Sequence, residues 1–336
     1  MIKQKDIAER AGVSRATVSR VFTKQAAIRP ETLRKIQNAM YELGVEAPPS
    51  FANDGGSHKN YVMIVAGDVS NEFYSQIIKG CCNGLSKHGM YAVVCDSNYS
   101  IEFEKSCINR AIQEKYGGII LITAVEDPEL VNLLRSVQIP VILANRYIRS
   151  LDMNMVCIDN YSGGYIAANY LIEHGHRKIA FLGGFKNSTA TQDRFRGYKE
   201  ALADAGLGFS DEHVFFSTQN ISDGRQFADE ALNRGLDFTA FFSTNCPLAV
   251  GAINRFAAEG ISVPDDISVV CFDDSLLISE DGMNLTTVSC EPYLIGQNSV
   301  SSLLRALDGE FSTKTTMLLP PQLIERTSVR HINDKI

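Results

Sequence analysis

Polar side chains follow several apolar runs of this 336-residue sequence within a few residues, where they could hydrogen-bond a ligand. These side chains belong to Asp68, Asp96, Thr123, Asn145, Asn245 and Asp273. Carboxylates and amides accept or share hydrogen bonds with hydroxyl groups, so such a set suits a polyhydroxyl ligand. Phe73 and Tyr74 follow the first run and could stack on an apolar ligand face. Asp and Asn also favour strand-ending turns for local reasons, which explains about half of the set.

A second group of candidate binding residues lies near the start of the chain. Gly12-Val13-Ser14 separates two short helical patterns at helix-turn-helix spacing, and the second helix of that motif enters the major groove of DNA. Its N-terminal residues, Arg15 and Ala16, would face base edges. Phosphate-bonding residues would be Ser14, Thr17 and Ser19, and Arg20 could reach either bases or phosphates. A three-helix bundle with a basic solvated face is the simpler alternative, and composition alone favours it.

The charge distribution supports a head that faces a polyanion. The whole chain carries a net charge of -7. Residues 1–45, however, hold nine Lys or Arg against four Asp or Glu, which gives +5 there and leaves -12 for the rest. This asymmetry is typical of a basic nucleic-acid-binding head on an acidic body.

Three short helices are expected in residues 1–45. Ile7, Ala8 and Ala11 form one apolar face, which ends at Gly12. Ser14 is a favourable N-cap for a second helix from Arg15 to about Phe22, and Pro30 suits the first position of a third. Residues 46–60 are rich in Pro, Gly, Ser and Asn and have the composition of a linker.

Short apolar runs alternate with amphipathic helical patterns from Tyr61 onward, which predicts parallel sheets covered on both faces. The runs are Tyr61–Ala66, Tyr91–Cys95, Gly118–Ile122, Val141–Ala144, Met155–Ile158, Lys178–Leu182, Thr239–Phe242 and Ile267–Phe272. Eight such units fit two doubly wound α/β lobes better than a single closed eight-stranded barrel, which is the structural alternative. In open parallel sheets, ligands bind at the carboxyl ends of the strands.

Several classes of protein are disfavoured. The sequence contains no GxSxG, HExxH or GxxxxGK[ST] motif, so we expect neither an enzyme nor a cofactor. Its six histidines and eight cysteines have no metal-ligand spacing, and the cysteines fit buried reduced thiols. No apolar stretch approaches the roughly 18 residues that span a membrane, and the charged first residues differ from a secretory signal, so we expect the cytoplasm.

The segment from Asp6 to Val21, DIAERAGVSRATVSRV, resembles the head of LacI/GalR-type transcription regulators. Further stretches that fit the family are IDNYSGG at 158–164, GHRKIAFLGG at 175–184, RFRGY at 194–198, VPDDISVV at 263–270 and LTTV at 285–288. The resemblance covers essentially the whole chain apart from residues 46–60.

This resemblance implies a helix-turn-helix DNA-binding domain at 1–45, a linker in place of a hinge helix at 46–60, and an effector-binding and dimerisation domain at 61–336. That domain would resemble periplasmic sugar-binding proteins and act as a homodimer on a near-palindromic operator. Its N-lobe would comprise about 61–158 and 290–320, and its C-lobe about 159–289 and 321–336. The family also implies that Arg194, Asn245 and Asp273 contact the effector; Arg194 is found only through the resemblance.

Three departures from the family pattern affect these expectations. The hinge stretch has no leucine, and Phe51 is its one bulky apolar residue, so we expect a flexible tether that leaves operator reading to the heads. Cys246 stands where the family usually has Asp, which puts the hydrogen bonding around Asn245 in doubt. The sequence ends at Ile336 without a leucine-heptad tail, which favours a dimer over a tetramer.

The expected function is therefore a ligand-responsive DNA-binding regulator, most simply a repressor of a carbohydrate-use operon. A small sugar or sugar derivative would change operator affinity allosterically. The alternatives are a cytoplasmic sugar-binding protein without independent DNA binding and a regulator that responds to a nucleoside or purine.

Overall fold

The computed structural model describes residues 3–23, 30–43, 45, 58–279, 281–309 and 314–332. Two compact units divide the chain, Met1–His58 and Lys59–Ile336. Most of the expected linker, residues 46–57, lies outside the described residues, and so does the hinge hypothesis built on it.

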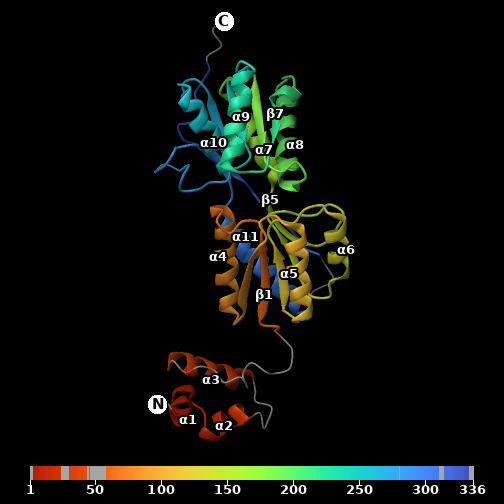
Figure 1. Cartoon of the computed structure of the whole chain (residues 1–336), viewed down its shortest axis with the longest axis vertical. Coiled ribbons are helices and arrows are strands. Elements are labelled where there is room, and N and C mark those ends of the chain that lie inside the picture. The colour runs from red at the N-terminus through yellow and green to blue at the C-terminus, as the bar shows by residue number, and fades with distance from the viewer. Residues whose placement is uncertain are drawn as a thin grey trace. The chain divides into compact units, whose positions relative to one another are not determined.

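The first unit contains the three predicted helices, coloured red in Figure 1. These are α1 (Gln4–Ala11), α2 (Arg15–Thr23) and α3 (Pro30–Glu42). They bury a common apolar core formed by Ile7, Ala8, Ala11, Val18, Val21, Ile36, Ala39 and Met40. Gly12 ends α1 with a left-handed φ of 65°, a backbone conformation that glycine adopts without steric cost. The turn between α1 and α2 therefore has the predicted helix-turn-helix form.

The second unit begins with a lobe built on a six-stranded parallel sheet, here called the N-lobe. The sheet order is β11-β5-β4-β3-β1-β2. Its strands are β1 (Tyr61–Ala66), β2 (Tyr91–Asp96), β3 (Gly118–Leu121), β4 (Val141–Ala144), β5 (Asn154–Ile158) and β11 (Thr316–Leu319). Helices α4 (Glu72–Lys87) and α11 (Pro292–Leu307) pack on one face of this sheet. Helices α5 (Ile101–Gln113) and α6 (Pro128–Ser136) cover the other face.

A second lobe, here called the C-lobe, repeats this architecture with sheet order β12-β10-β9-β8-β6-β7. Its strands are β6 (Ile179–Gly183), β7 (Val214–Phe216), β8 (Ala240–Ser243), β9 (Ser268–Phe272), β10 (Thr286–Ser289) and β12 (Gln322–Ile324). Helices α7 (Asn160–Glu173) and α8 (Thr189–Asp204) cover one face, and α9 (Ile221–Asn233) and α10 (Cys246–Ala258) cover the other. The short η1 (Asp211–His213) precedes β7, and only β12 pairs antiparallel.

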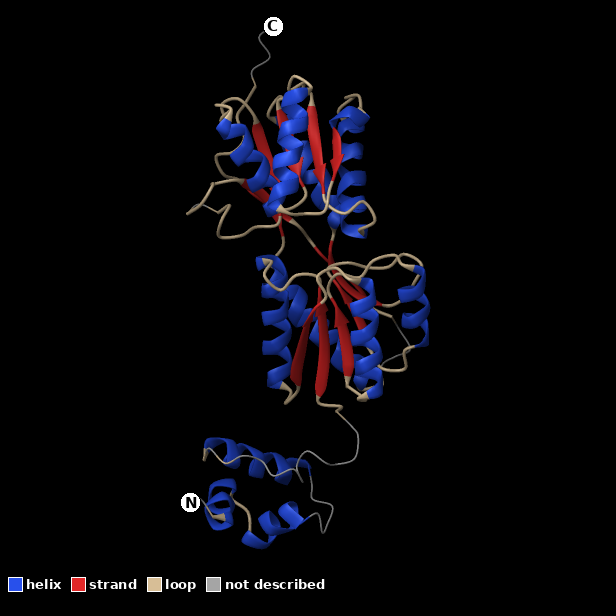
Figure 2. Ribbon diagram, viewed as in Figure 1, coloured by secondary structure: helices blue, strands red, loops and turns tan. Residues whose placement is uncertain are grey.

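The chain crosses between the two lobes three times (Figure 2). It leaves the N-lobe sheet at the end of β5 and enters α7 of the C-lobe. A return follows β10, where the chain enters α11 and packs against the N-lobe core. The third crossing joins β11 to β12 over two residues, Pro320 and Pro321. The strand ends of both lobes consequently face each other across these connections.

The predicted doubly wound α/β fold is confirmed, and two separate open sheets exclude the eight-stranded barrel. All eight predicted strands are present, with both ends within one residue of the expected positions. Four further strands, β7, β10, β11 and β12, are only three or four residues long and were not predicted from the sequence. All eight cysteines are free thiols, half of them buried and half partly exposed. Among the described residues, no helix has the length and apolar character to cross a membrane.

Candidate effector pocket and DNA-binding face

A pocket here called the inner pocket lies between the lobes at the carboxyl ends of their strands. In this structure the lobes close over it and leave only about 20 Å³, which is room for about one water molecule. It continues into a larger outer cleft of about 820 Å³. The inner pocket is lined by Asn71, Phe73, Tyr74, Asn145, Arg146, Ala190, Thr191, Arg194, Gln219, Asn245 and Asp273.

Several residues that line the pocket have a backbone φ in the left-handed region. Asn145 and Asp273 both have φ of 66°, and Gln219 has φ of 89°. Of the eight described non-glycine residues with positive φ, these three line the inner pocket, and Asn98 and Tyr99 line the outer cleft. Left-handed backbone is uncommon outside glycine and concentrates at functional sites, where surrounding structure holds it in place.

Arg194 and Asp273 are an oppositely charged pair that lines the inner pocket. The Arg194 Nε donates to Asn160 Oδ1 at 2.8 Å, and its Nη1 donates to the Thr244 carbonyl oxygen. Its guanidinium also lies 3.4 Å from the centre of the Phe272 ring. Arg194 Nη2 lies 3.7 Å from Asp273 Oδ1, close enough for an ion pair but too far for a hydrogen bond.

Burial is unfavourable for both charges of this pair. It raises the pKa of Asp273 to about 6, although Arg194 and Arg146 oppose that shift. It also lowers the pKa of Arg194, with Asp273 acting in the opposite direction. For both groups the cost of burying the charge is larger than the attraction between the two charges. Such a pair is costly for stability and available for a ligand.

Asn245 presents an amide donor to the pocket from the N-terminus of α10. Its Oδ1 caps the helix by accepting from the Leu248 N–H at 2.9 Å, so its Nδ2 is left for another partner. Cys246, which stands in the place of the family's usual Asp, turns its Sγ toward the Asp273 carbonyl oxygen at 3.6 Å. The doubt about this departure is resolved for Asn245 itself, because the helix cap holds the amide without help from residue 246.

Arg146 connects the two lobes inside the pocket. Its Nη2 donates to the Tyr74 hydroxyl at 3.1 Å in the N-lobe and to Gln219 Oε1 at 3.2 Å in the C-lobe. The side chain is among the largest that are fully buried, with 2% of the residue exposed. Gln219 is held in turn by close packing against Gly184, where a Cβ atom would lie 2.4 Å from the Gln219 side chain.

Four polar atoms buried in this pocket have no hydrogen-bond partner. They are Asn145 Oδ1, Arg146 Nη1, Asn245 Nδ2 and Asp273 Oδ1. Two come from each lobe, and they comprise two donors and two acceptors. Because buried polar groups in proteins are almost always hydrogen-bonded, their convergence indicates a site that a polar ligand completes.

A second set of contacts joins the lobes beside the pocket. The Tyr147 hydroxyl donates to Asp193 Oδ2 at 2.7 Å, and Arg149 Nη2 donates to Asp193 Oδ1 at 2.8 Å. Thr189 Oγ1 donates to the Tyr147 carbonyl oxygen at 2.9 Å. Tyr99 and Phe185 meet across the outer cleft with ring centres 5.1 Å apart. These contacts hold the lobes in a closed arrangement.

Six of the eight predicted effector residues line the inner pocket: Phe73, Tyr74, Asn145, Arg194, Asn245 and Asp273. Asp68 lines only the outer cleft, where its carboxylate accepts from Ser70. Thr123 lines neither space, so its expected role is corrected: its hydroxyl turns inward and donates to the buried Glu104. Arg146 and Gln219 were missed. Arg146 directly follows Asn145, and only its burial reveals it.

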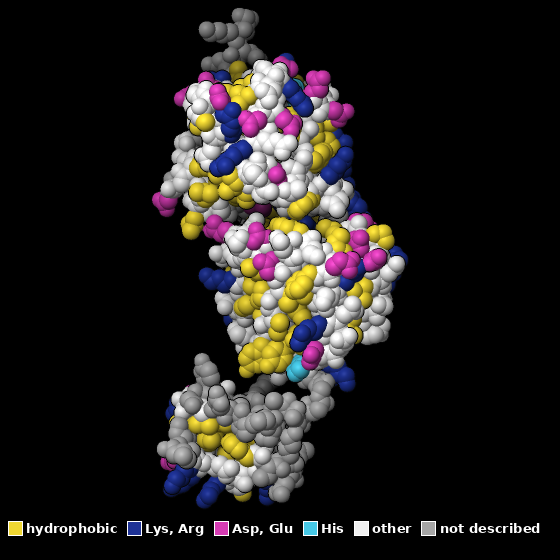
Figure 3. Space-filling model, viewed as in Figure 1, with side chains coloured by type: hydrophobic (Ala, Val, Ile, Leu, Met, Phe, Trp, Pro, Cys, Tyr) yellow, Lys and Arg dark blue, Asp and Glu magenta, His cyan; other side chains and the backbone are white. Residues whose placement is uncertain are grey.

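The predicted DNA-reading residues lie at the start of α2. Ser14 caps this helix, because its Oγ accepts from the Thr17 N–H at 3.1 Å. Arg15, Ala16 and Arg20 are exposed, whereas Thr17 and Ser19 are half-buried. Val18 faces the head's core, with no exposed surface. Lys and Arg side chains project from the surface of the head in Figure 3, as a phosphate-binding surface requires.

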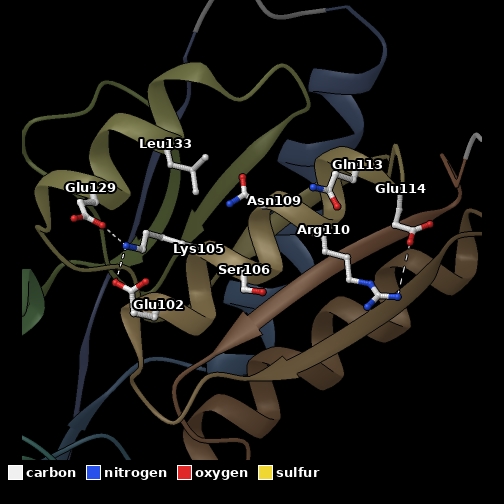
Figure 4. A pocket seen from close by; sticks show the side chains of 9 residues that line it. All are labelled: Glu102, Lys105, Ser106, Asn109, Arg110, Gln113, Glu114, Glu129 and Leu133. Atoms are coloured by element: carbon white, nitrogen blue, oxygen red, sulfur yellow. Dashed lines mark hydrogen bonds and ion pairs between the residues drawn. The ribbon is translucent and has the colours of Figure 1, made fainter.

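A shallow hollow of about 770 Å³ on α5 and α6 is larger than the inner pocket but lacks its chemistry. Figure 4 shows Lys105 between Glu102 and Glu129, and Arg110 beside Glu114. These charges are paired with one another at the surface. Among the residues drawn there, none is a buried polar group left without a partner. Size alone therefore does not identify the effector site.

A helix-turn-helix head joined to two parallel-sheet lobes around a polar pocket defines a ligand-responsive DNA-binding regulator. Residues 3–45 match the family described as bacterial regulatory proteins, lacI family, and residues 168–329 match the periplasmic binding protein-like domain. The HTH-type transcriptional regulator DegA of Bacillus subtilis (strain 168) is 31% identical over 331 residues, 98% of each chain. The chain therefore belongs to the LacI family of transcriptional regulators, and DegA and the other relatives that it matches are regulators rather than enzymes.

Solved structures show the same fold. The complex of the transcriptional regulator CelR with cellobiose has a TM-score of 0.74 and 28% identity, and the match covers 98% of this chain and 100% of that one. A lac repressor dimer bound to operator and an anti-inducer has a TM-score of 0.78 and 24% identity, covering 98% and 99% of the two chains. The helical head and both lobes are thus shared across the family.

Proposed function

We propose that this regulator is a repressor whose operator affinity is controlled by a small sugar or sugar derivative bound in the inner pocket. The observation that carries the proposal is the convergence of the four unpartnered buried polar atoms from both lobes. Two donors and two acceptors together suit hydroxyl groups, each of which both donates and accepts. Phe73 and Tyr74, with ring centres 6.1 Å apart, supply an apolar wall for a sugar ring. The cellobiose bound by the related CelR is a ligand of this class.

The head is proposed to read DNA through Arg15 and Ala16, with Ser14, Thr17 and Ser19 on phosphates and Arg20 on either. The lobes would have to open to admit the ligand, because the inner pocket now has only about 20 Å³, and this motion would alter the arrangement of two heads in a homodimer. A coupling of about 1–3 kcal/mol would change operator affinity by roughly 5- to 150-fold. Leu276 and Leu277, which are 73% and 55% exposed, are apolar surface that a second copy could cover. Sedimentation should give the mass of two chains, and a four-chain mass would contradict the dimer.

DNA binding can be tested by selecting genomic fragments on the full-length protein at fixed, near-physiological salt, because affinity depends steeply on salt. We expect enrichment of a palindromic site and a loss of about 10-fold or more in the selected affinity for Arg15→Ala. Lys35→Ala is the control, because Lys35 pairs with Glu31 on α3. Absence of any enriched site with folded protein would refute independent DNA binding.

The effector site can be tested with Asn245→Ser, which keeps a capping oxygen for the Leu248 N–H but removes the free amide donor. We expect a panel of sugars to raise the melting temperature of the wild type, and this variant to lose most of the shift. Asp127→Ser is the matched control, because Asp127 caps α6 outside the pocket. An unchanged sugar response in Asn245→Ser would place the effector elsewhere.

A further inference from the structure

Two arginines, Arg146 and Arg194, line the inner pocket, and none lines the outer cleft. Among the described residues, Arg146 forms no ion pair with a carboxylate. Arg194 has Asp273 at 3.7 Å. Outside these linings, Arg326 holds Asp274 in a two-pronged contact at 2.8 and 3.0 Å. Arg146 instead donates to two neutral oxygens, and its Nη1 has no partner. A fully buried guanidinium without an anion is expensive, so its presence demands an explanation.

Two carboxyl groups act electrostatically on Arg146, and neither supplies the missing anion. Glu104 accepts hydrogen bonds from Ser97 and Thr123 at 3.2 Å each. Burial raises the pKa of Glu104, with Arg146 opposing the shift, so its charge is disfavoured. Asp273 is engaged with Arg194 and is similarly disfavoured as an anion. The unpartnered Nη1 is therefore available to an anion that a ligand brings.

We propose that the effector is an acidic sugar whose carboxylate binds Arg146 while its hydroxyls bind Asn145, Asn245 and Asp273. This proposal rests on the proposed function and names the class of its ligand. The Gln219 amide oxygen now occupies one donor of the guanidinium. A planar carboxylate presents two oxygens at the spacing of a guanidinium edge, which makes Arg its preferred partner. The incoming carboxylate would take over the donor that Gln219 releases.

The surroundings favour a carboxylate over a phosphate. Besides Asp273, which is engaged with Arg194, the outer cleft is lined by the carboxylates of Asp68, Glu72 and Asp274, and no Lys or Arg is among its lining residues. A doubly charged phosphate would be repelled by these carboxylates, and only one guanidinium without an ion pair, that of Arg146, would attract it. A singly charged carboxylate directed inward needs only Arg146 and leaves the neutral part of the sugar toward the outer cleft.

The test is calorimetric titration of the full-length protein with D-glucuronate and D-galacturonate, with D-glucose and D-galactose, and with the two hexose 1-phosphates. We expect one hexuronate to bind about 10- to 100-fold more tightly than its matched hexose, as for hydrogen bonds to charged groups. Arg146→Gln should remove this preference, and Arg146→Lys should keep part of it. Arg110→Gln is the control, because Arg110 is 71% exposed and pairs with Glu114 outside both pockets.

Equal or tighter binding of the neutral hexoses would overturn the acidic-sugar proposal and leave the proposed function standing. Tighter binding of a hexose phosphate would overturn it in favour of a phosphate site. A hexuronate preference that survives in a folded Arg146→Gln variant would refute the role of Arg146. If that variant fails to bind operator DNA or to fold, the wild-type ratio of hexuronate to hexose affinity still decides the ligand class. Absence of binding by every sugar would refute the proposed sugar response itself.

Discussion

The two lobes use the same backbone device at the pocket but present opposite charge. In the N-lobe, Asn145 follows β4 with φ of 66°, and its N–H donates to the Val156 carbonyl of β5 at 2.8 Å. In the C-lobe, Asp273 follows β9 with φ of 66°, and its N–H donates to the Val288 carbonyl of β10 at 2.9 Å. The N-lobe residue is a neutral amide followed by Arg146, whereas the C-lobe residue is a carboxylate.

This difference separates what the fold requires from what the ligand requires. Both positions need a residue that tolerates left-handed backbone, and Asn and Asp do so better than most side chains. Asn and Asp differ mainly in charge, so the charge at each position is set by the ligand and not by the backbone. The C-lobe places its acid beside Arg194, and the N-lobe keeps its amide beside an arginine without an ion-pair partner. Exchanging or removing these groups should therefore change effector binding in different ways in the two lobes.

The largest effect is expected for Arg194→Ala. Loss of this side chain leaves Asn160 Oδ1 and the Thr244 carbonyl without their donor and removes the counter-charge of Asp273. Chemical denaturation should show a loss of about 3 kcal/mol, and the effector response should disappear while operator binding persists. Arg196→Ala is the control, because that neighbouring side chain is 55% exposed. Loss of both DNA binding and the effector response would indicate a structural role for Arg194.

Asp273→Asn should weaken the effector response about 10- to 100-fold and yet stabilise the free protein at pH 7. The pKa of Asp273 is about 6 in the fold against an ordinary value of 3.8. Between these values the unfolded chain loses its proton first, so this group lowers the free energy of unfolding as pH rises from 4 to 6. The variant should lack that slope and be more stable than the wild type above pH 6.

The neighbouring substitution Asp274→Asn provides the contrast to Asp273→Asn. It leaves the buried Arg326 guanidinium without its two-pronged partner, so it should destabilise the protein at the same pH. Denaturation curves of both variants at pH 4, 6 and 8 would check these opposite signs. Equal destabilisation by the two substitutions would show that Asp273 contributes to stability after all.

Asn145→Asp makes the N-lobe resemble the C-lobe at this position. The new carboxylate would lie next to Arg146 and compete with an anionic ligand, while the left-handed backbone remains acceptable. We expect roughly tenfold weaker hexuronate binding and little change for the matched neutral hexose, measured by calorimetry. A parallel loss for both ligands would mean that the new carboxylate disturbs the binding of the sugar hydroxyls and does not act through Arg146.

The smallest effect is expected for Tyr147→Phe, which removes one hydrogen bond between the lobes and involves none of the four unpartnered pocket atoms. A single hydrogen bond contributes about 0.5–1.5 kcal/mol, so the apparent effector affinity should fall less than about 10-fold. Tyr165→Phe is the matched control, since its hydroxyl donates to Asp204 within the C-lobe. An identical change in both variants would remove any special role for the contact between the lobes.

Much of the fold could be predicted because long buried strands leave a clear apolar signal. Val62 to Ala66 and Val269 to Phe272 are apolar throughout, as parallel strands covered on both faces must be. The missed strands lack this signal. Val214–Phe216 has only three half-buried residues, and β11 alternates between exposed and half-buried positions at the edge of its sheet.

The site was predictable where a strand end determines it. Asn145, Asn245 and Asp273 follow that rule, but Arg194 lies on a helix and was found only through the family resemblance. Gln219 follows β7, a strand too short to be recognised in the sequence. The expectation that ligands bind at strand ends therefore could not identify it. Thr123 satisfied the rule and still lies outside the pocket, because the buried carboxylate of Glu104 beneath it determines where its hydroxyl turns. Such competition between partners is a tertiary property that local sequence does not encode.

The three crossings between the lobes also restrict how the lobes can move. A single connecting strand would allow one body to swing, twist and slide on the other. Three connections after β5, β10 and β11 tie the lobes at separate points, so twisting about any one strand stretches the others. Rotation about one axis through the connections is the motion that remains. A ligand that contacts both Asn145 and Asp273 therefore changes mainly one angle between the lobes. Because the lobes rotate as bodies, a small movement at the pocket becomes a larger displacement at the far ends of the lobes.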